Sequence, residues 1–210
     1  MQGRSELYYP NRIARAIFMA MDDVMGAHGL QSLLSLARME QYADSLPPDD
    51  MSRAVDFSSI AALNIALEEL YGANGGRGMA LRIGQRAFVG GLKNFGAMRA
   101  ANDAAFRNLP VHKRTEYGLQ GLALILTNFS DQKSSVVVKE DSLEFISEVS
   151  PYAWGRNTNK PVCHMMVGII MECLRWSTNG YKFYVREIEC TATGAERCVF
   201  RINKQAIGEQ

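Results

Sequence analysis

The spacing of apolar residues changes near residue 130, and this change constrains the fold more than any other feature. Before it, apolar residues recur every three or four positions, as on one face of a helix. After it, they alternate with polar residues or form short runs bounded by turns, as in strands. We therefore expect an α+β fold, with N-terminal helices followed by an antiparallel sheet and a helix packed across it. A mainly helical part at residues 1–130 and an α+β part at residues 131–210 are expected to form one compact domain.

Apolar stripes predict the helices of the first part. The expected helices lie at residues 10–26, 30–42, 58–72, 78–89 and 110–129. Gly72 is expected to end the third helix, with a turn over residues 73–76. Gly84, Gly90 and Gly91 lack side chains, so they would let a neighbouring helix or a ligand approach the backbone closely.

The second part alternates strands with one helix. Strands are expected at residues 134–138, 143–149, 182–189 and 197–203, the last two joined by a turn that contains Gly194. Between these pairs, Pro161 opens a segment whose apolar residues fit the helical template as far as Trp176. This segment is the helix that we expect to cross the sheet.

Net charge, the N-terminal residues and the cysteine count bear on the partners and the cellular compartment of the protein. A formal net charge of +1 provides no excess of basic residues to attract phosphate, so nucleic acid is not expected as a partner. The polar start at residues 1–9 lacks the apolar core of a signal peptide, and the uncharged runs are too short for a membrane span. Four cysteines without such a signal favour a reducing compartment, and we expect a cytoplasmic protein.

Cysteines near the C-terminus are the strongest sign of chemistry. Cys163 lies at the start of the expected helix, and Cys190 and Cys198 follow with Glu187 in the expected strand–turn–strand. A small metal site or a reactive thiol cluster uses such a combination of donors. Alternatively, Cys190 and Cys198 face each other across a hairpin as small buried residues, and Cys163 packs in the core. Cys173 lies on the apolar stripe of the helix and is expected in the core.

The same C-terminal region resembles the 4-vinyl reductase domain, a hydrocarbon-binding module of bacteriochlorophyll-synthesis proteins and of phenol-responsive bacterial activators. The resemblance rests on Pro161-Val162-Cys163, Trp176 to Gly180, Arg186-Glu187 and the run from Cys190 to Phe200. The N-terminal helices look like those of the stand-alone members of the bacteriochlorophyll pathway. The resemblance implies binding of a hydrophobic or aromatic small molecule, with a tetrapyrrole as one candidate.

A metal site is also implied by the resemblance. In the phenol-sensing branch, three cysteines and a glutamate hold zinc, and the corresponding residues here are Cys163, Glu187, Cys190 and Cys198. Glu187 and Cys190 are three positions apart, so a regular strand would point them to opposite faces of the sheet. A β-bulge would be required to bring the two side chains together.

A pocket for the small molecule is expected where the crossing helix meets the sheet and the long helix at residues 110–129. Its expected lining residues are Tyr117, Phe145, Trp154, His164 and Met165. Arg82 and Arg86 share one helix face and are candidate partners for the carboxylates of a tetrapyrrole. The alternative is that the aromatic and methionine side chains are ordinary core and that the arginines lie on a solvated face.

Three functions fit these features. The first is a carrier or sensor of a hydrophobic molecule, the second an enzyme or enzyme accessory acting on a porphyrin, and the third a dimeric interaction scaffold without a small ligand. Because the sequence shows neither a catalytic-triad pattern nor a dinucleotide-binding fingerprint, a ligand-binding protein is favoured over an enzyme. A homodimer is expected through the N-terminal helices, whose apolar residues include Ile13, Ile17, Phe18, Met21 and Leu33 to Leu36.

Overall fold

The computed structural model describes residues 3–99 and 103–208. Two long helices, α1 (Asn11–Leu36) and α2 (Phe57–Gly90), each bend at a glycine, Gly26 with φ 74° and Gly72 with φ 70°. Glycine takes up such positive φ values without steric cost. The expected interruptions at these glycines therefore exist, but the expected turn over residues 73–76 is wrong, because helix follows the bend directly.

The segment after α1 also differs from the expected helix at residues 30–42. α1 ends at Leu36, and a short 3-10 helix, η1 (Glu40–Tyr42), follows after Arg38 has adopted a positive φ of 56°. A small antiparallel sheet, which was not expected, joins β1 (Tyr8–Pro10) to β2 (Arg53–Asp56). Strands of three and four residues are too short to show an alternating pattern in the sequence.

The chain between α2 and the main sheet is helical in short pieces before one long helix. It comprises η2 (Leu92–Asn94), α3 (Gly96–Arg99), α4 (Ala104–Arg107) and α5 (Val111–Phe129). Asp103 caps α4 by accepting a hydrogen bond from the backbone N–H of Ala105. The expected long helix at residues 110–129 is confirmed by α5.

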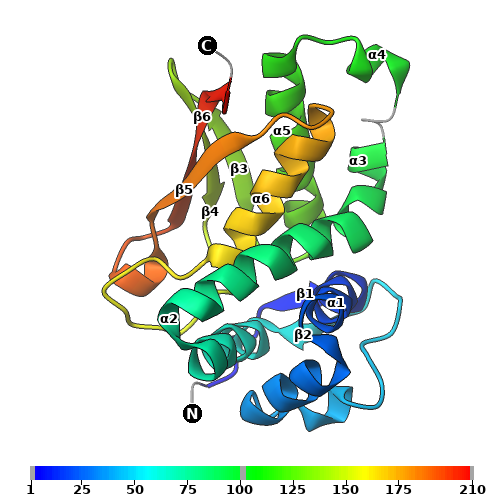
Figure 1. Ribbon diagram of the computed structural model, residues 1–210, viewed down its shortest axis with the longest axis vertical. Coiled ribbons are helices and arrows are strands. Elements are labelled where there is room, and N and C mark those ends of the chain that lie inside the picture. The colour runs from blue at the N-terminus through cyan, green and yellow to red at the C-terminus, as the bar shows by residue number, and fades with distance from the viewer. Residues whose placement is uncertain (1–2, 100–102, 209–210) are drawn as a thin grey trace.

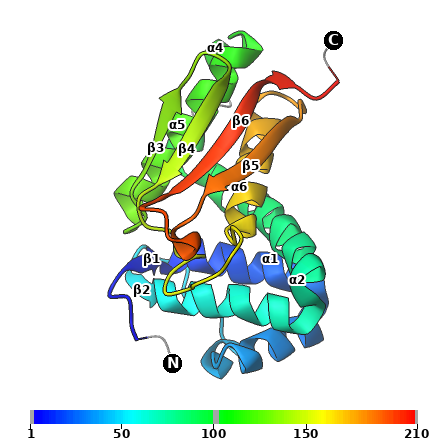
Figure 2. The same ribbon diagram turned by 90° about the vertical axis from the view of Figure 1, so that its left-hand side faces the viewer.

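The main sheet has four antiparallel strands in the order β3-β4-β6-β5. Its strands are β3 (Ser134–Val138), β4 (Ser142–Ser147), β5 (Phe183–Glu189) and β6 (Cys198–Ala206). Helices α5 and α6 (His164–Ser177) cover one face of the sheet, and α1 and α2 lie beyond one end of it (Figures 1 and 2). The predicted α+β architecture is confirmed.

One face of the sheet is buried against the helices, and the other carries charged side chains. Phe145 and Phe200 lie opposite each other on β4 and β6 and are fully buried, with ring centroids 6.3 Å apart. On the other face, Glu144 pairs with both Lys139 and Arg201. This alternation is the expected one for a sheet with one solvated face.

Two glycines allow α2 and α6 to cross in backbone contact. A Cβ atom at Gly84 would lie 2.0 Å from the carbonyl oxygen of Met165, and one at Gly168 would lie 2.1 Å from that of Leu81. Neither position can therefore carry a side chain without separation of the helices. The expected role of Gly84 in a close helix approach is confirmed.

Buried apolar side chains from both parts of the chain join in one cluster, which runs from Tyr9 to Ala206. It includes Ile13, Ile17, Phe18 and Met21 of α1. None of the helices in the described part of the chain combines the length and the apolar character needed to cross a bilayer.

Candidate metal centre

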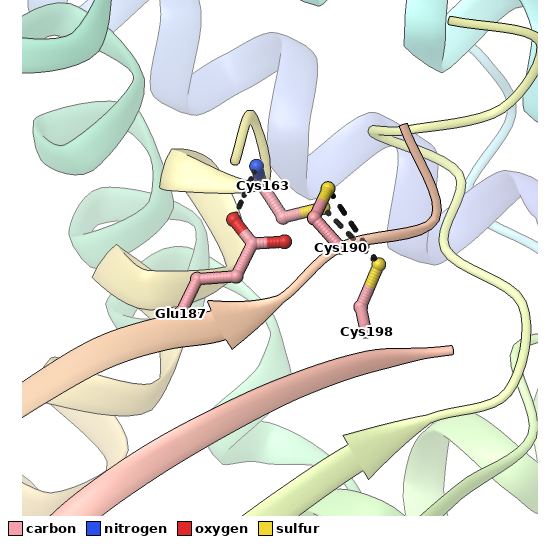
Figure 3. A group of neighbouring side chains, drawn as sticks. All are labelled: Cys163, Glu187, Cys190 and Cys198. Carbon is pink, nitrogen blue, oxygen red and sulfur yellow. Dashed lines mark hydrogen bonds between the residues drawn. The ribbon is translucent and has the colours of Figure 1, made fainter. Parts of the chain in front are cut away.

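The four residues that were predicted as metal ligands lie together at one end of the main sheet. Cys163 immediately precedes α6, Glu187 lies on β5, Cys190 follows β5, and Cys198 begins β6 (Figure 3). The register between β5 and β6 shifts between Glu187 and Glu189, which is the irregularity needed to turn Glu187 and Cys190 toward each other. All four side chains are buried.

The distances between the donor atoms suit one small ion. The Sγ atom of Cys163 lies 3.9 Å from that of Cys190 and 3.7 Å from that of Cys198, and the Cys190 and Cys198 sulfurs are 4.0 Å apart. All four donor atoms lie within 4.8 Å of one another. Sulfur ligands at about 2.3 Å from a tetrahedral zinc lie roughly 3.8 Å from one another. The three sulfurs therefore stand at the separations of zinc ligands.

Glu187 is oriented as a fourth ligand. Its Oε2 atom accepts a hydrogen bond of 2.9 Å from the backbone N–H of Cys163, whereas its buried Oε1 atom has no hydrogen-bond partner among the described residues. Figure 3 shows the carboxylate beside the three sulfurs. A buried carboxylate oxygen without a partner is costly, and a metal ion at the centre of the cluster would satisfy it.

Neighbouring polar groups support the sulfurs. The hydroxyl of Ser150 lies 3.2 Å from the Cys163 sulfur, and the backbone N–H of Thr191 donates a 3.3 Å hydrogen bond to the Cys198 sulfur. Thr191 opens the 3-10 helix η4 (Thr191–Thr193) between β5 and β6. Such hydrogen bonds orient metal ligands and stabilise thiolate charge.

Four acidic groups in one buried cluster cannot all ionise without a cation. Burial raises the pKa of Glu187 to about 8 and raises the pKa of Cys163 well above its usual value. Hydrogen bonds with the Cys163 and Cys190 thiols lower the pKa of Cys198 to about 4. A metal ion bound by the cluster would displace protons from these groups as it binds.

The geometry favours a metal or thiol cluster over unrelated buried cysteines. Three thiols and a carboxylate converge on one point, whereas Cys173 lies apart from them in the core, as expected, with its thiol donating to the carbonyl oxygen of Gly118. The donor set and the spare carboxylate oxygen fit a divalent ion that prefers sulfur.

The residues expected to line a pocket occupy different environments. Phe145 and Met165 are fully buried in the core, and Tyr117 on α5 is 45% exposed. Trp154 and His164 are half-buried, and burial followed by the nearby positive charge of Arg77 lowers the pKa of His164. Of these five side chains, only that of Trp154 lines either the hollow beside the cysteine cluster or the larger groove along α1.

The two arginines proposed as carboxylate partners already have contacts. Arg82 lies against the sulfur of Met79, one turn away on α2. Arg86 forms a 2.7 Å ion pair with Asp23 of α1, and both side chains are more than half exposed.

A hollow of about 240 Å³ lies beside the cysteine cluster. Its walls include Ser150 and Thr191, which contact the cluster, together with Trp154 and Arg156. Arg156 forms a 2.7 Å ion pair with Glu68 of α2, yet its buried Nη1 atom has no partner among the described residues. Trp154 is therefore the expected ligand-binding residue that lines a hollow next to the centre.

A larger groove, of about 640 Å³, lies between α1, the segment that follows α2 and the end of α5, and was not expected from the sequence. Its walls come from α1, the loop before β2, the end of α2 with η2, and the end of α5. Gly90 and Gly91, whose backbone a neighbouring helix or a ligand was expected to approach closely, are among the residues that line it.

Comparison with known proteins supports the assignment of the C-terminal region. Residues 144–204 match the V4R domain, so the resemblance to the 4-vinyl reductase family is confirmed over that stretch. The matched range contains all four residues of the cluster. None of the curated proteins matches the chain.

Solved structures with a similar fold are H-NOX proteins. The H-NOX protein from K. algicida, in its Fe(II) unliganded form, is 16% identical with a TM-score of 0.55, over 94% of this chain and 99% of that chain. The H-NOX protein from S. oneidensis, in its Fe(II)NO state, is 13% identical with a TM-score of 0.54, over 91% and 98%. A structure solved to probe heme distortion in the H-NOX family is 15% identical with a TM-score of 0.57, over 96% of this chain and 98% of that chain. The chain therefore has an H-NOX-like α+β fold.

Proposed function

We propose that this chain binds a hydrophobic or aromatic small molecule, as a carrier or sensor, and that one Zn²⁺ ion braces its V4R region. The observation that carries the proposal is the buried convergence of Cys163, Glu187, Cys190 and Cys198 within the V4R match. Bound there, the ion ties the start of α6 to the hairpin of β5 and β6, which adds folding energy to a region of short strands.

Zinc is favoured over other ions by the donor set. Three thiolates and one carboxylate form a tetrahedral set with no open position, and the sulfur separations of 3.7–4.0 Å suit it. Closed tetrahedral sites of this kind are structural rather than catalytic. The proposed role of the ion is therefore to hold the fold rather than to activate water.

The proposed ligand-binding residues are Trp154, His164, Tyr117, Met165 and Phe145. Trp154 supports this proposal because it lines the hollow beside the cluster. A tetrapyrrole is the more specific candidate, because the similar structures include one solved to probe heme distortion in the H-NOX family and an H-NOX protein in its Fe(II) form. Arg82 and Arg86 are then the candidate carboxylate partners, once the ion pair of Arg86 with Asp23 opens.

Two other functions remain as alternatives. An enzyme or enzyme accessory acting on a porphyrin would require turnover of such a substrate. A homodimeric scaffold would require an apolar face on the N-terminal helices, and the side chains that suggested one, including Ile13, Ile17 and Leu34, are buried within the monomer. Met19 and Leu36 of α1 are about half exposed and are the candidates for a dimer contact. A single compact domain and a cytoplasmic location complete the proposal.

Native mass spectrometry with elemental analysis of freshly purified protein tests the proposal. One zinc per chain and a co-purified apolar molecule are the expected results. Titration with simple aromatics and with a chlorophyll precursor, followed by tryptophan fluorescence, then measures affinity directly. If neither ligand class binds below millimolar concentration, and Trp154→Ala changes stability alone, the scaffold function replaces the binding function.

A further inference from the structure

The groove along α1 has the volume of a ligand site. Its volume of about 640 Å³ falls within the range of about 300–1,000 Å³ that is usual for small-molecule pockets. It lies between α1 and the segment that leaves α2, and the last residue of α5, Phe129, closes one side. None of its walls belongs to the cysteine cluster.

Apolar side chains are unusually exposed around this groove. Met19, Met51 and Phe129 are 49%, 36% and 41% exposed, and all three line it. Phe129 packs against the nearly buried Phe95, with ring centroids 5.6 Å apart. Two methionines and a pair of rings give an adaptable apolar surface of the kind that binds flat or elongated guests.

The positive charge in the groove is not fully compensated. Arg12 pairs with Asp49 at 2.6 Å and also reaches its backbone carbonyl oxygen at 3.2 Å. Arg15, one turn further along α1, donates a 2.8 Å hydrogen bond to the carbonyl oxygen of Pro47. No carboxylate of residues 3–99 or 103–208 forms an ion pair with Arg15, so its guanidinium is free to bind an anionic group of a ligand.

Adjacent glycines shape one wall. A Cβ atom at Gly91 would lie 2.4 Å from the Cβ of Ala16, which shows how closely α1 approaches there. A Cβ atom at Gly90 would meet no atom within 4 Å, although Gly90 also lines the groove. The backbone at Gly90 is thus open to a guest, whereas the backbone at Gly91 is closed by the neighbouring helix.

We propose that this groove binds an anionic amphiphile, a molecule with a flat or elongated apolar body and a carboxylate, whose body lies on Met19, Phe95 and Phe129 and whose carboxylate binds Arg15. The inference rests on the proposed ligand-binding function and moves its site away from the cysteine cluster. Neutral hydrocarbons would occupy the same apolar walls without the contact to Arg15.

Pyrenebutyrate and its neutral counterpart pyrenebutanol provide a matched pair of fluorescent probes for the 210-residue protein as purified. Fluorescence anisotropy measures the affinity of each. Gly90→Leu places a side chain where the guest would lie, and Gly78→Leu is its control, because Gly78 lies on the same helix, faces open space and does not line the groove. Arg15→Gln removes the charge, and Arg201→Gln on the solvated face of the sheet is the control for that change.

Gly90→Leu is expected to weaken both probes by at least about tenfold, and Arg15→Gln to weaken pyrenebutyrate by about tenfold while leaving pyrenebutanol within about twofold. Both control variants should bind as the wild type does. Equal affinities in Gly90→Leu and Gly78→Leu would overturn the groove site. If the wild type binds neither probe but binds aromatics or a chlorophyll precursor, the groove proposal fails and the binding function stands. If the wild type binds neither the probes nor these ligands, both the groove proposal and the proposed binding function fail.

Discussion

The cysteine centre and the groove are opposite kinds of site in one chain. The centre is fully buried, and its four donors come from a segment of fewer than forty residues, Cys163 to Cys198. The groove is open, and its walls come from positions as distant as Arg12 and Phe129. One site is closed by its own side chains, whereas the other leaves apolar and charged groups facing outward.

This difference separates stability from binding. The buried Oε1 atom of Glu187 has no hydrogen-bond partner among the described residues, which destabilises the folded state. An ion bound in the cluster would remove this cost. Met19 is exposed, and Arg15 is partly exposed and has no carboxylate partner among the described residues, so both side chains are available to a ligand that binds reversibly. We therefore expect changes at the centre to alter the free energy of unfolding, and changes at the groove to alter affinity.

The largest effect is expected from loss of a proposed metal ligand. Cys190→Ser should release zinc and lower the free energy of unfolding by at least about 4 kcal/mol, since loss of a structural metal is among the most costly single changes. Urea unfolding with parallel zinc analysis measures both quantities. Cys173→Ser is the control: its thiol is also buried but lies outside the cluster, so metal content should not change. Full zinc occupancy in Cys190→Ser would show that the centre is not the metal site.

The crossing of α2 and α6 connects the two regions, and its disruption should be the next largest effect. Gly168→Val forces a side chain against the Leu81 carbonyl oxygen, 2.1 Å from the Cβ position, so the two backbones must separate. We expect a loss of about 3 kcal/mol in the free energy of unfolding. Gly78→Val adds the same side chain to an open position on α2, and denaturant unfolding should show a much smaller loss. Equal losses in the two variants would mean that helix propensity, not the crossing, sets the cost.

A smaller effect at the centre concerns metal affinity rather than folding. Ser150→Ala removes the hydroxyl that lies 3.2 Å from the Cys163 sulfur, and loss of such an outer hydrogen bond should weaken zinc binding by about tenfold. Competition with a chromophoric chelator measures the change. Ser142→Ala, a buried serine on β4 whose hydroxyl contacts Asp141 instead, should leave zinc affinity unaltered. Unchanged affinity in both variants would remove Ser150 from the site.

The sequence revealed the centre but not the groove, for physical reasons. Strand alternation placed β3 correctly and β5 and β6 within a few residues, so the hairpin that carries Cys190 and Cys198 was predictable. Cysteine is rare and chemically specific, and the bulge near Glu187 was expected because the resemblance placed Glu187 and Cys190, three positions apart, in one ligand set. The groove consists of common residue types, and its walls come from segments that are far apart in the sequence, from Arg12 to Phe129, which leave no periodic pattern.

The smallest expected effect tests whether the wall of the groove at Gly90 is open. Gly90→Ala adds a methyl group to open space at the end of α2, and alanine favours helix over glycine by up to about 1 kcal/mol, so stability should stay constant or rise slightly. Gly91→Ala, one residue later, would press against Ala16 at 2.4 Å and should lower the free energy of unfolding by about 1–2 kcal/mol. Thermal unfolding of the two variants measures the difference directly. A destabilised Gly90→Ala would mean that this wall is packed rather than open, and the groove would then lack room for a guest.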